Sequence, residues 1–168
     1  RRHGEPFAGF WGRHYAAPVG RAKARLFTRY GLWYETPNPQ NLVIQLDREL
    51  RPTGRLVFRD LGDTYCATDA FEATSAPWTR LTADIRPETE NSFWAFGEAG
   101  ECAVEPAVLA DWYERHDAAY FGELARSFPD AAPEPAPDDA GRALGWSRAL
   151  RTRRGERAIA DGHRRLLG

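Results

Sequence analysis

The chain has 168 residues, the size of one domain and enough to bury a substantial apolar core. Its 23 basic and 24 acidic residues give a formal net charge of −1, so no overall field favours nucleic acid or an anionic membrane. No apolar run reaches the roughly 20 residues of a membrane-spanning helix, and the two cysteines, Cys66 and Cys102, have no metal-like spacing. These features favour a cytoplasmic protein without a membrane or nucleic-acid partner. Because the sequence lacks Met even at position 1, we expect a longer precursor.

The first predicted element is a helix over residues 7–30. Its apolar residues at helical spacing are Tyr15, Val19, Ala22 and Leu26. Pro18 is expected to kink this helix or divide it in two, because proline removes a backbone donor. Gly31 stands where a C-capping glycine belongs, and residues 32–35 then predict a short strand.

Residues 35–63 predict a β-hairpin with polar residues at its open end. Residues 41–47 and 55–60 are rich in aliphatic and β-branched residues, and residues 51–54 carry the proline and glycine typical of a connecting turn. A hairpin brings its outer ends together, so we expect the polar side chains there to lie close to one another. They are Glu35, Asn38, Gln40 and Asn41 before the hairpin and in its first strand, and Arg59, Asp60 and Asp63 after it. Such a cluster of amides and carboxylates would suit a divalent cation and the phosphates that it bridges.

A second long helix is predicted over residues 106–128, and Glu105 followed by Pro106 is its start signal. No regular element is predicted for residues 64–82. The residues expected on the helix's buried face are Leu109, Trp112, Tyr113, His116, Tyr120, Phe121, Leu124 and Phe128. Glu114, Asp117 and Glu123 are assigned to its solvent side, and His116 is interpreted as a core histidine.

The remaining sequence completes the predicted domain organisation. Residues 129–139 form a Pro/Ala/acidic linker, and residues 140–168 predict an Arg-rich helical tail. Residues 1–128 would then be one α+β domain, in which a small antiparallel hairpin or sheet packs against the two long helices.

The order of four short motifs along this chain resembles the catalytic half of the siderophore synthetases that work without a peptide-synthetase template, the IucA/IucC type. Those enzymes show a helix ending in Y-G, an E-x-H-x-Q-N segment, a hairpin and an R-D-F/L-G-G/D segment. The matching positions here are Tyr30-Gly31, Glu35, Gln40-Asn41 and Arg59-Asp60-Leu61-Gly62-Asp63. The resemblance covers residues 10–65 and the following helices in outline.

The resemblance implies a kinase-like palm subdomain and an ATP-dependent carboxylate ligase with Mg²⁺. Members of the family adenylate citrate or a related acid and then pass the acyl group to an amine or hydroxyl. On this basis Asn41 and Asp60 would face the metal and triphosphate, with Asp63 as a further metal candidate. Gln40 and Glu35 would support that site, and Arg59 would hold anionic oxygens.

The sequence departs from the family pattern at two points, which limit the functional roles that the resemblance implies for this chain. Asn38 stands where the family has histidine, and an amide cannot act as an imidazole acid or cation. The family's nucleotide site also uses basic residues from an upstream lobe, which this chain lacks, so an upstream lobe or partner chain is expected. The single lysine, Lys23, falls on a predicted helix and is a poor substitute for a strand-borne lysine.

Two other functions stay open. A kinase-like phosphotransferase would hold its metal ion with the same kinds of residue, an amide and a following acid, although no Asp precedes Asn41 to accept a hydroxyl proton. A non-catalytic relative acting as an accessory or binding domain is the third possibility. In that case Asn38 belongs to a rigid turn between two prolines, Asn41, Asp60 and Asp63 are capping or turn residues, and Arg59 pairs with a surface carboxylate.

Overall fold

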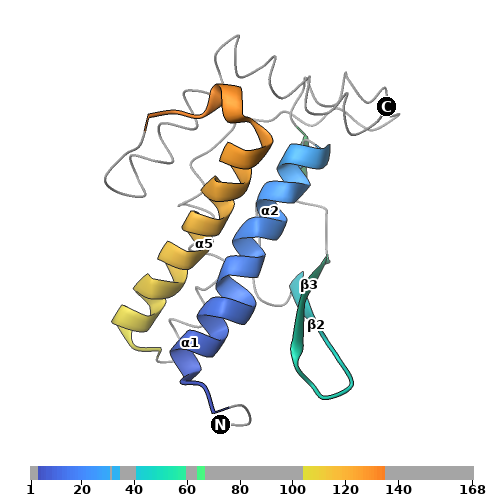
Figure 1. Ribbon diagram of the computed structural model, residues 1–168. Coiled ribbons are helices and arrows are strands. Elements are labelled where there is room, and N and C mark those ends of the chain that lie inside the picture. The colour runs from blue at the N-terminus through green and yellow to red at the C-terminus, as the bar shows by residue number, and fades with distance from the viewer. Residues whose placement is uncertain (1–3, 31, 35–40, 60–63, 67–103, 135–168) are drawn as a thin grey trace.

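Two long helices lie side by side in the computed structural model, which describes residues 4–30, 32–34, 41–59, 64–66 and 104–134 (Figure 1). They are α2 (Ala17–Tyr30) and α5 (Pro106–Ser127), and they run in the same direction. A hairpin of β2 (Leu42–Leu46) and β3 (Pro52–Phe58) lies beside α2, and β1 (Leu32–Tyr34) pairs with β4 (Thr64–Cys66). Helices combined with two-stranded antiparallel sheets confirm the α+β class.

The predicted helix over residues 7–30 is helical throughout but has three parts. α1 (Phe7–Trp11) leads into a π-helical turn, Gly12–Ala16, which continues into α2. In this turn the Ala17 N–H bonds the Gly12 carbonyl, five residues back. The wide turn ends at Ala16, two residues before Pro18, which has no N–H to donate, so the proline is accommodated without a break in the helix.

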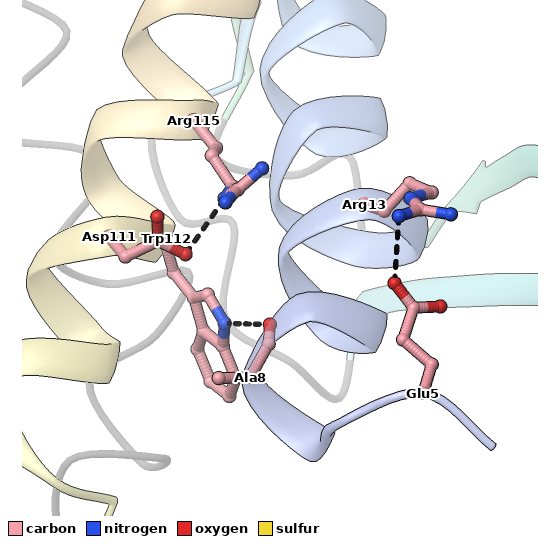
Figure 2. A network of polar contacts seen from close by, with 6 residues as sticks. All are labelled: Glu5, Ala8, Arg13, Asp111, Trp112 and Arg115. Carbon is pink, nitrogen blue, oxygen red and sulfur yellow. Dashed lines mark hydrogen bonds and ion pairs between the residues drawn. The ribbon is translucent and has the colours of Figure 1, made fainter.

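Contacts with α5 hold α1 in place (Figure 2). The Trp112 indole Nε1–H donates to the Ala8 carbonyl at 2.9 Å, and the Trp112 ring lies 5.8 Å from the Phe7 ring. Around this bond the Arg115 guanidinium pairs with Asp111 at 2.7 Å. Trp112 is buried, so its one polar atom is satisfied in the way that a buried indole requires.

α5 begins and ends where the sequence predicts, with Pro106 as its first residue and Phe128 as its C-cap. Its apolar face packs against α2 and, nearer its N-terminal end, against the π-helical turn and α1. At one end Ala16, Val19, Trp112 and Leu42 of the hairpin form a buried cluster. At the other end the Phe27 and Phe128 rings meet edge to face at 6.4 Å.

The hairpin is confirmed, but the predicted turn at residues 51–54 is wrong. The strands pair Leu42 with Phe58 and Leu46 with Pro52, so β3 already begins at Pro52 and the turn spans residues 47–51. Gly54 lies inside β3 with φ +77°, next to a register irregularity in the pairing. Pro and Gly therefore mark the first part of a bulged strand here, and both residues are common in such positions.

Two other predictions differ from the structure. The short strand after α2 is confirmed as β1, but its partner β4 falls at residues 64–66, where no regular element was predicted. Its three residues are too few to show a periodic pattern. The predicted linker begins with a 3₁₀ turn at Pro129–Ala131. The C-capping Gly31 and the helical tail at 140–168 lie outside the described residues.

Candidate functional site

One hydrogen bond just outside the paired strands joins the two chain segments at the open end of the hairpin. The Arg59 N–H donates to the Asn41 carbonyl at 2.8 Å, directly after the Leu42–Phe58 pair. The Asn41 side chain is turned inward, with 8% of the residue exposed, whereas Arg59 is exposed. The structure therefore brings together these two predicted site residues, one buried amide and one surface guanidinium.

The other predicted site residues lie outside the described part of the chain. They are Glu35, Asn38, Gln40, Asp60 and Asp63. Gln40 directly precedes Asn41 in the sequence, and Asp60 directly follows Arg59. Each is therefore joined by a peptide bond to one of the two residues, Asn41 and Arg59, that the structure brings together. Among the residues that the structure describes, no three of His, Cys, Asp and Glu are grouped so as to hold a metal ion.

A second group of polar residues lies between α2 and α5. Lys23 of α2 is 4% exposed, and His116 and Asp117 of α5 are 0% and 2% exposed. The His116 Nδ1 and an Asp117 carboxylate oxygen are 2.7 Å apart, and the imidazole stacks parallel to the Tyr120 ring at 6.4 Å. We call Lys23, His116 and Asp117 the buried polar cluster.

The imidazole of His116 is held in its neutral form. Burial lowers its pKa to about 4, and the nearby charge of Lys23 acts in the same direction, while the hydrogen bond to the Asp117 carboxylate opposes both. Burial is the largest of these causes because a charged imidazole would lose its water on all sides. At neutral pH the cluster therefore contains an uncharged imidazole whose Nδ1 lies against a carboxylate.

The placement of this cluster corrects the prediction for α5. Asp117 and Glu123 were assigned to the solvent side, but both are buried, and only Glu114 is exposed there. The Glu123 carboxylate bonds Arg25 of α2 at 3.2 Å and Arg126 of α5 at 2.7 Å, so its charge is compensated. The signal was present in the spacing, because Asp117 and Glu123 each lie three residues from the buried Tyr120.

Comparisons with protein-family models, with curated proteins and with solved structures find no match for this chain. Among the described helices, none combines the length and the apolar character that crossing a membrane requires. The protein is thus defined as an α+β chain with a closed hairpin end and a buried polar cluster.

Proposed function

We propose that this chain is the catalytic portion of an ATP-dependent carboxylate ligase of the IucA/IucC siderophore-synthetase type. Its kinase-like palm would bind Mg-ATP at the open end of the β2–β3 hairpin. The observation that supports this is the closed pair of Asn41 and Arg59, because it joins two of the motif segments at the hairpin's end. The reaction would be acyl-adenylate formation on citrate or a related acid, followed by condensation with an amine or hydroxyl.

In this proposal the charge of each residue at the hairpin's open end sets its role. Asn41 and Asp60, with Asp63 beside them, would supply oxygen ligands to a cation that bridges phosphate oxygens. Arg59 would pair with the developing negative charge on the phosphates, and Gln40, Glu35 and Asn38 would support the site from the preceding segment. The metal, when bound, makes pyrophosphate a better leaving group. An upstream lobe or partner chain would complete the nucleotide site.

Calorimetry of Mg-ATP against the full 168-residue chain tests the site directly. We expect binding that Asp60→Ala abolishes and that Arg59→Gln weakens about tenfold or more, since each removes a charge-assisted contact. Arg55→Gln is the matched control, because Arg55 is also an exposed arginine of the hairpin, four residues before Arg59. Equal affinities for the wild-type chain, Asp60→Ala and Arg59→Gln would contradict the proposed site.

The reaction class needs a second measurement, made with the chain joined to an upstream lobe. A ligase exchanges pyrophosphate into ATP only when its carboxylate substrate is present. A phosphotransferase would release ADP and leave a phosphorylated acceptor, which would replace the ligase assignment by the kinase-like one.

A non-catalytic accessory domain is the second candidate, and the burial of Asn41 favours it. A buried amide can complete the hydrogen bonding of a hairpin end without holding any ligand. In that case Asn41→Ala would lower stability but leave affinity for Mg-ATP or a protein partner unchanged.

A further inference from the structure

The exposed apolar residues of the described structure gather on the hairpin. The large apolar side chains that are well exposed there are Phe7 of α1 and four residues of the hairpin, Val43, Leu46, Leu50 and Val57. Val43 and Val57 are paired across β2 and β3 and are 42% and 55% exposed. Exposed apolar side chains that adjoin one another, unlike single ones, are typical of a contact site for another molecule.

The two valines lie on the face of the hairpin that is turned away from the helices. Leu56 and Phe58 of β3 pack against the apolar cluster between the hairpin and the helices. Because side chains alternate between the two faces of a strand, Val57 points outward. Its partner Val43 points the same way, and so does the exposed Arg55, two residues before Val57. We call Val43, Arg55 and Val57 the outer face of the hairpin.

The charge on this side of the hairpin has one sign. Arg48, Arg51 and Arg55 are exposed, and in the described part of the chain none of them forms an ion pair. The acidic residues of the hairpin, Asp47 and Glu49, belong to its turn, where the Asp47 carboxylate accepts backbone N–H groups. Adjoining valines and an unpaired guanidinium are complementary to a partner that carries apolar side chains and carboxylates. A second copy of this face would set arginine against arginine.

β2 also has backbone groups to offer along one edge. Among the described residues it pairs with β3 alone, and β3 is the strand that packs on α2 and on the π-helical turn. Since the Arg59 N–H bonds the Asn41 carbonyl, antiparallel alternation directs the backbone groups of Leu42 and Ile44 away from β3. No charge or proline interrupts β2, although such residues commonly protect an edge strand. The edge therefore suits an extended segment of a partner.

We propose that the outer face of the hairpin binds an acidic, extended segment of a partner protein, which adds to the edge of β2. An apolar side chain of the segment packs on Val43 and Val57, and a neighbouring carboxylate pairs with Arg55. This inference goes beyond the proposed function and does not depend on it, since none of these three residues belongs to the proposed nucleotide site.

A dye-labelled peptide tests the face on the full 168-residue chain. The probe is a capped peptide of about seven residues, the length of a strand, in which Glu and Val alternate. Fluorescence anisotropy follows its binding, which we expect to be saturable and to weaken as salt is raised. Peptides with Lys in place of Glu, or with Ser in place of Val, should bind about tenfold more weakly or less. Equal binding of all three peptides overturns the inference.

Substitutions locate the binding on the hairpin. Arg55→Glu should weaken binding of the Glu–Val peptide by about tenfold or more, because attraction becomes repulsion. Val57→Thr keeps a β-branched side chain but removes apolar contact, and should weaken binding about threefold. Both side chains are exposed, so the fold does not depend on them. Arg21→Glu makes the same change in net charge at an exposed position of α2 and should leave the affinity unchanged. Equal losses for Arg55→Glu and Arg21→Glu overturn the inference.

Two other occupants of the face are outcomes of the same experiment. Dimerisation in analytical ultracentrifugation that Val57→Thr abolishes, without binding of the Glu–Val peptide, would assign the face to a second copy and overturn the inference. Binding to vesicles of anionic lipid, again without binding of the peptide, would overturn it in favour of a membrane surface. A chain that binds none of these overturns it as well.

Discussion

Gly20 of α2 lies directly against the backbone carbonyl of His116 of α5. A Cβ placed on Gly20 would stand 2.1 Å from that oxygen, closer than any real contact allows. The neighbour is helix backbone, which cannot turn aside as a flexible side chain can. The backbones of the two helices are therefore in direct contact beside the buried polar cluster, and glycine is required there because of space and not because of its φ angle.

Gly20→Ala should destabilise the fold by about 2 kcal/mol, because the helices must separate and the gain in helix propensity offsets only part of that cost. Chemical denaturation measures the change. Gly122→Ala is the matched control, since Gly122 lies in α5 with nothing within 4 Å of an added Cβ. That control should gain stability by about 0.5–1 kcal/mol, and a loss of similar size in both variants would contradict the close crossing.

Folding stability should fall as the solution is acidified, because His116 is held neutral in the fold. Burial lowers its pKa from 6.5 to about 4, so the unfolded chain takes up a proton first as the pH falls. The stabilisation is therefore complete above pH 6.5 and is lost as the pH falls toward about 4. Linkage gives a loss of about 2 kcal/mol between about pH 7.5 and about pH 5.

The variant His116→Gln isolates this contribution from the carboxylates that also titrate in acid. It carries no titratable ring, so its free energy of unfolding should change less between the two pH values than that of the wild-type chain. Denaturation curves at both pH values make the comparison. Identical pH dependence in the two proteins would show that His116 is not held neutral by burial.

Glu123 links the two helices through its two arginine partners. Glu123→Gln should cost about 1 kcal/mol, since both ion pairs lose their charge while Arg25 and Arg126 stay partly in water. The effect should shrink at high salt, which screens exposed charges. Glu114→Gln, on the exposed side of the same helix, is expected to change stability little, and an equal cost for it would contradict the role of Glu123.

Leu50 holds a strained backbone conformation in the hairpin turn. Its φ is +59°, in the left-handed region, and its N–H donates to the Asp47 carbonyl at 3.1 Å. The Asp47 carboxylate also accepts the N–H groups of Glu49 and Arg51 at 3.0 and 2.8 Å. These bonds stabilise the turn, although residue 50 is a leucine.

Leu50→Gly should therefore stabilise the chain by about 1 kcal/mol, because glycine adopts this conformation without the cost of a Cβ. Leu50 is exposed, so little buried area is lost. Thermal unfolding of Leu50→Gly and of Glu49→Gly gives the comparison. Glycine at position 49, where φ is not positive, should lower stability, and a lower melting temperature for Leu50→Gly would contradict the strain.

Much of the fold could be predicted because its helices and its hairpin are formed by residues that are close together in the sequence. The helical spacing from Tyr15 to Leu26 and the start signal at Pro106 led to the two helices, and the two aliphatic runs led to the hairpin. The turn was misplaced because Pro and Gly mark bulged strands as well as turns. The hydrogen bond between Asn41 and Arg59 follows from the hairpin itself.

The sequence by itself determined which described segments are helical, which form the hairpin and that Asn41 and Arg59 meet at its open end, because periodicity and strand pairing act over a few residues. Only the tertiary structure decided that Lys23, Asp117 and Glu123 are buried. Their burial depends on α2 and α5 packing in parallel at the distance that Gly20 permits, and that contact joins residues about a hundred positions apart. Helical spacing places Asp117 and Glu123 next to the buried Tyr120, but long-range contacts decide whether a charged side chain at such a position faces water or a neighbouring helix.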